Sequence, residues 1–146
     1  MNYRFIIQEL KESPDPIVRA FVREVEKMKR LTHEERYRYL KNRHEPESIR
    51  FLVNDYIPYI IGVAYNHREK ARKLSVLDLI DEGILGAYAA FDRYDYQGRY
   101  MMITLRHFIK RYILNLIEKN GNMINVDFFS HERDLDAIEL YNKFYN

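Results

Sequence analysis

Three carboxylates lie close together in one short stretch of the chain: Asp78, Asp81 and Glu82. Their spacing of three and four residues places them on one face of a helix. Grouped carboxylates can transfer protons or hold a metal ion, but both tasks need further groups at set positions. Alone, such a face is more often a solvated surface, and its charge also suits contact with a basic partner.

The sequence does not show the other groups that enzymes commonly use at the spacing that catalysis needs. The chain has no cysteine, which excludes a thiol nucleophile, disulfides and thiolate metal sites. Its histidines do not stand at the spacing from an acid that zinc and di-iron helices use. These are His33, His44, His67, His107 and His131. No glycine-rich phosphate loop is present, and Gly83 and Gly86 lie inside a helical pattern, where glycine permits close packing of helices. We therefore expect no enzyme, with no catalytic residue, no metal site and no cofactor.

A basic group lies further along the chain. Residues 97–121 contain Arg99, Arg106, Lys110, Arg111 and Lys119 against the single acid Glu118. Together with His107, the basic residues 106, 110 and 111 have spacings of one, three and four, which predict one exposed basic patch on a helix. Such a patch is either a solvated face or a surface for nucleic acid, because clustered Lys and Arg displace counterions from phosphates.

Composition limits the class of protein. The 146 residues are 47% apolar and 32% charged, the length of about one domain. The 24 Lys and Arg against 22 Asp and Glu give a net charge of +2, which by itself favours no partner. The absence of cysteine predicts a reducing compartment, the cytoplasm. No stretch approaches the roughly 18 apolar residues of a membrane span, and the first residues lack the pattern of a signal peptide.

Helix signals dominate the elements that must position these residues. Asp15 before a proline, Thr32 with Glu35, and Ser75 with Asp78 each predict a helix start. Pro58 falls inside a helical pattern, where we expect a kink or a break. The predicted helices cover residues 15–28, 34–43, 45–64, 77–94 and 100–119, with a last one after Ser130.

The apolar residues of three helices predict their buried faces. In the first predicted helix they are Ile17, Phe21, Val25 and Met28. In the helix over 77–94 they are Leu77, Ile80, Ile84, Tyr88 and Phe91. In the helix over 100–119 they are Met101, Leu105, Phe108, Ile109, Tyr112 and Leu116. The sum is an all-α, compact bundle of about six helices. It forms one domain over residues 1–122, followed by a connector and an acidic helix over residues 123–146.

Residues 76–96 (VLDLIDEGILGAYAAFDRYDY) resemble a known segment, the polymerase-binding part of the sigma-70 family of bacterial RNA polymerase initiation factors. The family pattern there reads L-D-L-I-Q-E-G-x-x-G-L. Residues 51–64 are similar to the family's preceding helix, and residues 15–19 and 31–35 to the short region before it. The resemblance spans residues 15–126 and implies a fold like the family's second conserved region.

The resemblance implies two interfaces. In the family, the central helix docks on a basic coiled coil of the largest polymerase subunit. The matching positions here are Leu77, Asp78, Asp81, Glu82 and Tyr88. The next helix reads and melts the promoter's minus-ten element, stacking non-template bases on aromatic rings and holding phosphates with basic residues. The matching positions are Arg99, Tyr100, Thr104, Arg106, His107, Phe108, Lys110, Arg111 and Leu114.

The chain departs from the family pattern in two respects. The base-stacking tyrosine falls on Thr104, and the paired tryptophans fall on His107 and Phe108. The helix-turn-helix domain that reads the minus-35 element has no counterpart. A truncated sequence, a second protein that supplies this recognition, or a factor that works without it would each explain the difference.

Three functions stay open at this point. The first is an initiation factor that brings core polymerase to a promoter and captures non-template bases. The second is a sigma-like adaptor, or one half of a split factor, that needs a partner for promoter recognition. The third is a helical DNA-binding protein unrelated to polymerase.

Overall fold

The computed structural model describes residues 3–71, 73–93 and 101–120. Within these ranges the chain forms six α-helices, one short 3-10 helix and no strand, which confirms the all-α prediction. In chain order they are α1 (Tyr3–Lys11), α2 (Pro16–Lys27), α3 (His33–Lys41), α4 (Pro46–His67), the 3-10 helix η1 (Arg68–Lys70), α5 (Val76–Arg93) and α6 (Met101–Lys119). None of these helices has both the length and the apolar character needed to cross a membrane.

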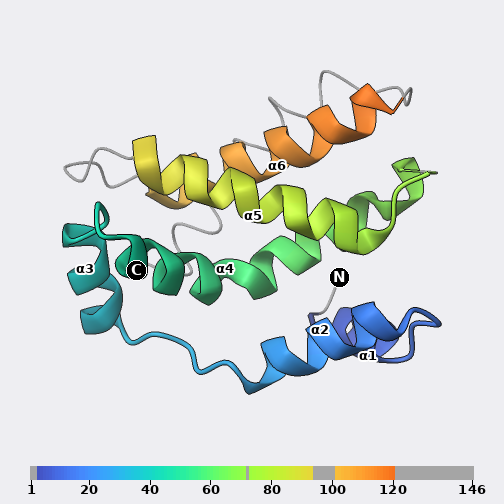
Figure 1. The fold of residues 1–146 in the computed structure, drawn as a ribbon, viewed down its shortest axis with the longest axis horizontal. Helices are drawn as coiled ribbons and strands as arrows, with labels where there is room; N and C mark the ends of the chain where they lie inside the picture. The colour runs from blue at the N-terminus through green and yellow to red at the C-terminus, as the bar shows by residue number, and fades with distance from the viewer. Residues whose placement is uncertain (1–2, 72, 94–100, 121–146) are drawn as a thin grey trace.

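The helices pack in layers around α4 (Figure 1). On one side α5 packs against α4, and α6 packs mainly against α5. On the other side α1 and α2 pair with each other, and α1 contacts α4. Helix α3 covers the first half of α4. The centre of the core is fully buried and consists mainly of aliphatic side chains from α4, α5 and α6, including Ile60, Ile61, Ile80, Leu105 and Ile109, together with the ring of Phe91.

The predicted helix starts are confirmed by their capping contacts. The Asp15 carboxylate accepts a hydrogen bond of 2.9 Å from the Ile17 amide, with Pro16 in the first helical turn of α2. Thr32 and Glu35 form a reciprocal capping box at the start of α3, at 3.1 and 3.0 Å. These contacts satisfy amide groups that have no partner within the helix, and they fix where each helix begins.

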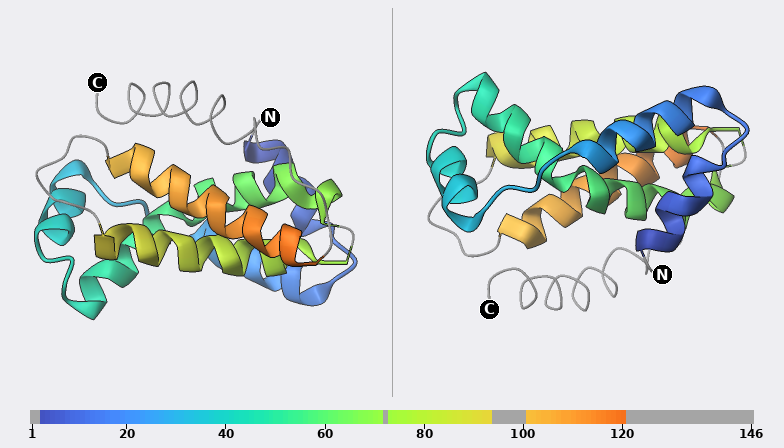
Figure 2. Two further views of the ribbon diagram at one scale, coloured as in Figure 1. Left: turned by 90° about the horizontal axis from the view of Figure 1, so that it is seen from above. Right: turned by 90° about the horizontal axis from the view of Figure 1, so that it is seen from below.

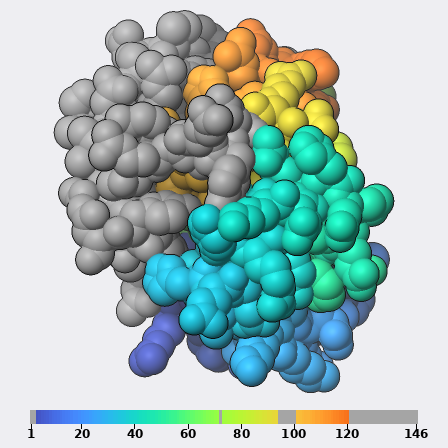
Figure 3. Space-filling view, turned by 90° about the vertical axis from the view of Figure 1, so that its left-hand side faces the viewer, coloured from blue at the N-terminus to red at the C-terminus, as the bar shows by residue number. Residues whose placement is uncertain are grey.

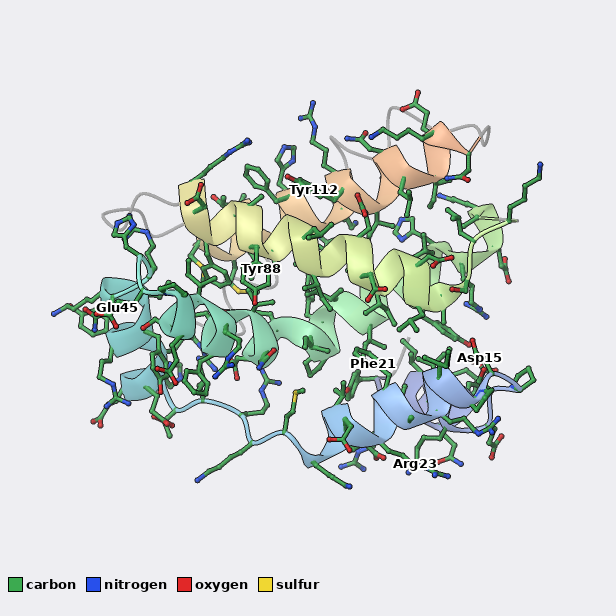
Figure 4. All side chains as sticks on the ribbon, in the orientation of Figure 1. Asp15, Phe21, Arg23, Glu45, Tyr88 and Tyr112 are labelled. Carbon is green, nitrogen blue, oxygen red and sulfur yellow. The ribbon has the colours of Figure 1, made fainter. Side chains whose placement is uncertain are left out.

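The predicted buried face of α2 is wrong in part: Val25 is buried and Phe21 packs against the core, but the other two residues do not. Ile17 is 63% exposed and Met28 is 40% exposed. Phe21 points toward α4 while Arg23 points away from it (Figure 4). Helix α2 carries two overlapping apolar stripes, and the second is displaced from the first by one residue toward the C-terminus. Because α2 packs beside α1, the second stripe is the one that is buried. The residues buried on α2 are Val18, Val22 and Val25.

Two other predictions about helices met different outcomes. Of the kink or break expected at Pro58, the break does not occur, because α4 runs through this residue without interruption. Burial of neighbouring residues such as Ile57 and Ile61 offsets the one backbone hydrogen bond that proline removes. Helix α1 was not predicted, although Ile6, Ile7 and Leu10 supply its buried side. The predicted helix after Ser130 lies outside the described residues.

Close contact between α5 and α6 confirms the interpretation of the two helix glycines. Gly83 and Gly86 are both buried on α5. A Cβ atom at Gly86 would lie 2.7 Å from the carbonyl oxygen of Phe108 and 3.0 Å from the Cα of Ile109. Seen from above, α5 and α6 run side by side (Figure 2). The backbones of the two helices therefore touch where α5 has no side chain.

We expect Gly86→Ala to destabilise the protein and Gly62→Ala to stabilise it. The added methyl group at position 86 presses on rigid backbone atoms, and such overpacking costs about 1–3 kcal/mol. A Cβ at Gly62 meets nothing within 4 Å. There, alanine brings only its better helix propensity, a gain of about 0.5–1 kcal/mol. Urea unfolding followed by circular dichroism measures both. Equal changes in the free energy of unfolding for the two substitutions would contradict the close contact between α5 and α6 at Gly86.

Candidate functional site

The predicted carboxylates form an acidic ridge, here defined as Asp78, Asp81 and Glu82, on the first half of α5. Asp78 and Asp81 are exposed and Glu82 is half-buried. Asp78 also belongs to the helix cap: it accepts a hydrogen bond of 2.9 Å from the Ser75 amide, and its own amide donates to the Ser75 hydroxyl at 3.1 Å. Part of its carboxylate is therefore engaged, and Asp81 and Glu82 are the acids most available to a partner.

The ridge carries electrostatic strain. Partial burial, and secondarily the negative charge of Asp78, raise the pKa of Asp81 above its ordinary value. Like charges three residues apart on a helix repel each other. A cationic partner would relieve this repulsion and favour the ionised form of Asp81. The ridge is thus a local concentration of negative charge on the first half of α5.

Apolar side chains continue the face of the acidic ridge. Tyr88 is 37% exposed and lies between α5 and α4 (Figure 4). It lines a shallow groove together with Ile49 and Arg50 of α4. Leu85, which the sequence analysis missed, is 54% exposed. Its position four residues after Asp81 and three after Glu82 was the signal that could have found it. Leu77, the fifth predicted residue, is half-buried at the start of α5.

The predicted exposed basic patch on α6 is wrong in part. Arg106 and Lys110 are only 5% and 4% exposed. A nitrogen of the Arg106 guanidinium donates a hydrogen bond of 2.9 Å to the Tyr59 hydroxyl of α4. Helix α6 buries a wide face because it packs against α5 and also contacts α4. Both cations belong to that face, and long aliphatic stems allow Arg and Lys to be buried in this way.

The remaining predicted positions on α6 divide into surface and core. Arg111 is exposed, Thr104 is half-buried, and Leu114 is 1% exposed and belongs to the core. His107 and Phe108 are half-buried and their rings meet edge to face, with centroids 6.0 Å apart. Arg99 and Tyr100 lie outside the described residues.

Arg93 joins this surface and was not predicted. Its guanidinium lies 5.3 Å from the centre of the Phe108 ring, a distance typical of a cation–π contact. No sequence spacing links two residues fifteen positions apart, and only the packing of α5 on α6 brings them together. We call Arg93, His107, Phe108 and Arg111 the aromatic–basic surface.

The acidic ridge and the aromatic–basic surface occupy successive parts of one helix pair. The ridge lies on the first half of α5, whereas Arg93 is its last residue. Figure 3 shows α3 and the start of α4 beside the last part of α5 and part of α6. Among the described residues, no group of three or more His, Asp or Glu side chains is placed to hold a metal ion.

Comparison with known proteins adds no family to this description. No family model matches the chain, and no curated protein matches it. The function must therefore be inferred from the residues and their geometry.

Proposed function

We propose that the chain is a sigma-type transcription initiation factor that binds bacterial core RNA polymerase through α5. The single observation that carries the proposal is the composition of one α5 face. It combines the surface carboxylates Asp81 and Glu82 with the exposed side chains Leu85 and Tyr88. Carboxylates beside apolar contacts suit a basic helical partner, because charge fixes the orientation and apolar burial adds affinity. The basic coiled coil of the largest polymerase subunit, which the sigma resemblance implies, has this chemistry.

The promoter-binding part of the proposal involves α6. Single-stranded bases stack on aromatic rings, and basic side chains nearby hold the strand's phosphates. The aromatic–basic surface offers two rings, His107 and Phe108, with Arg93 and Arg111 beside them. In this proposal the factor captures non-template bases of the minus-ten element and acts in the cytoplasm, without bond chemistry of its own.

The second candidate function is an adaptor, or one half of a split factor, that binds polymerase and needs a partner at the promoter. Burial of Arg106, Lys110 and Leu114 favours it, because these three positions are withdrawn from the surface that would meet DNA. Because Thr104 stands in place of the family's stacking tyrosine, fewer aromatic rings remain on which bases could stack. Each lost stacking contact forfeits about 1–3 kcal/mol per base.

Charge reversal on the acidic ridge tests the polymerase part of the proposal. We expect the double variant Asp81→Lys/Glu82→Lys to bind core polymerase at least about tenfold more weakly, because it replaces attraction by repulsion at the centre of the contact. Glu9→Lys/Glu12→Lys, at a residue of α1 and at the residue directly after its end, is the matched control: both residues are exposed and the change in net charge is the same. Co-purification with core enzyme, followed by a binding titration, measures the effect.

Unchanged polymerase binding by the ridge variant would refute the docking assignment. The DNA part is tested separately with fluorescent single-stranded non-template oligonucleotides. Salt-sensitive and sequence-selective binding that Phe108→Ala weakens supports an initiation factor. Polymerase binding without any oligonucleotide binding supports the adaptor.

A further inference from the structure

The segment over residues 127–146 carries charge of the opposite sign to the aromatic–basic surface. Its side chains include five acids against two bases, which gives a formal net charge of −3. The acids are Asp127, Glu132, Asp134, Asp136 and Glu139, and the bases are Arg133 and Lys143. The proposed function assigns no role to this segment.

The sequence of the segment predicts an amphipathic helix with an acidic edge. Leu135 and Ile138 have the helical spacing of an apolar stripe. Glu132, Asp136 and Glu139 stand four and three residues apart, which places them on one face beside that stripe. A helix of this kind suits a surface that offers cations next to partly exposed apolar groups.

The aromatic–basic surface has both features. Arg93 and Arg111 are exposed, and neither forms an ion pair with an acid of the described part of the chain. The half-buried Phe108 ring lies 5.3 Å from the Arg93 guanidinium, and Tyr112, one turn further along α6, is also half-buried. Acids of a docked segment would give the two cations the counter-charges that the described residues do not supply.

The chain between α6 and the segment is long enough for this contact. Lys119 ends α6, and Phe108 lies eleven residues before it, which is about 16 Å along the helix axis. The eleven residues 120–130 can span up to about 36 Å when they are extended. The segment can therefore fold back along α6 and reach Phe108 of the same molecule.

We propose that residues 127–146 dock on the aromatic–basic surface of their own chain. The acidic edge contacts Arg93 and Arg111, and the apolar stripe contacts Phe108. The docked segment occupies the groups that hold phosphates and stack bases, so a nucleic-acid strand must displace it. This competition rests on the proposed function, whereas the docking itself does not. The segment thus reduces the fraction of molecules that are competent to bind nucleic acid.

A nitroxide spin label on the segment tests the docking in the full 146-residue chain. Because the chain has no cysteine, Asn146→Cys provides a single attachment point. We expect the label to broaden the amide signals of residues 107–111 in NMR spectra, while the signals of α2 keep their intensity. Broadening of α2 to the same extent, or no broadening of residues 107–111, would overturn the docking.

Reversal of the charges shows whether the contact is electrostatic. Arg93→Glu/Arg111→Glu should remove the broadening, because it replaces attraction by repulsion. Adding Asp136→Lys/Glu139→Lys to this variant should restore the broadening, because attraction returns with both signs exchanged. Unchanged broadening in the first variant, or none in the combined variant, would contradict the assigned contacts.

A matched control and a mixing experiment complete the test. Arg23→Glu/Lys29→Glu reverses two exposed charges, on α2 and just after its end, and should leave the broadening unchanged. An equal loss in this control would overturn the docking site. In a mixture of spin-labelled chain and isotope-labelled chain without the spin label, we expect no broadening. Broadening there would assign the segment to the surface of a second copy and would overturn docking within one chain.

Competition with nucleic acid is measured separately, with a fluorescent single-stranded oligonucleotide. Asp136→Asn/Glu139→Gln should bind it at least about threefold more tightly than the wild type, because the competent fraction rises. Glu9→Gln/Glu12→Gln makes the same change in net charge at exposed positions and should leave the affinity nearly unchanged. Equal gains in the two variants would overturn the competition. If no variant binds the oligonucleotide, the competition and the promoter-binding part of the proposed function both fail, while the spin label still decides the docking.

Discussion

Replacing Asp55 by alanine is expected to lower the free energy of unfolding by about 3–5 kcal/mol, because it leaves a buried guanidinium without its counter-charge. The Asp55 side chain has no exposed surface. Its carboxylate accepts hydrogen bonds from the Leu31 amide at 2.9 Å and from the Arg36 side chain at 3.0 Å. Arg36 in turn donates to the Leu31 carbonyl at 3.2 Å. This network ties the connection between α2 and α3 to α4, so its loss affects both.

Urea denaturation of two control variants shows whether burial is the cause. Glu47→Ala removes an exposed ion pair with Arg50 at 3.8 Å, and such surface pairs contribute about 0–1 kcal/mol. The double variant Asp55→Leu/Arg36→Met removes both buried charges together and should be less destabilised than Asp55→Ala. A loss for Asp55→Ala as small as that for Glu47→Ala would show that the network contributes little.

The second large effect is a loss of stability in acid that depends on His67. Burial, and then the positive charges of Lys70, Lys110 and Arg106, lower the pKa of His67 to about 4, against the opposing hydrogen bond to the Val63 carbonyl. That carbonyl lies 2.7 Å from Nδ1, which must therefore be the protonated nitrogen. In the unfolded chain the pKa is about 6.5. Between these values the unfolded state binds a proton that the folded state does not.

Stability therefore falls as the pH decreases from about 6.5 toward about 4, and the contribution of His67 to this fall approaches about 3 kcal/mol. Urea midpoints measured across this range should decrease less steeply for His67→Gln than for the wild type. His44→Gln replaces an exposed histidine and should keep the wild-type slope. Identical slopes in all three proteins would show that His67 titrates normally in the folded state.

Local signals predicted the boundaries of several helices well. Caps such as those at Asp15 and Thr32 depend on residues only two or three positions apart, so the sequence contains all of their chemistry. The face that a helix buries depends instead on its neighbours. Helix α2 offers two overlapping apolar stripes, and only packing beside α1 decides that Ile17 remains in solvent.

The same distinction holds for the candidate site. The acidic ridge could be predicted because its members share one helix, and Asp78 and Asp81 are indeed exposed. The burial of Arg106 and Lys110 could not be predicted. A cluster of basic residues on a helix is expected at the surface, and only the contacts with α4 show otherwise. Arg93 was missed for a related reason: its partner Phe108 belongs to another helix.

The missing side chain at Gly86 has a mechanical consequence. With no side chain of α5 between the two backbones at this point, any residue larger than glycine would overlap main-chain atoms of α6. The spacing of the two helices is therefore set here by main-chain atoms, which cannot change rotamer to make room as a side chain can.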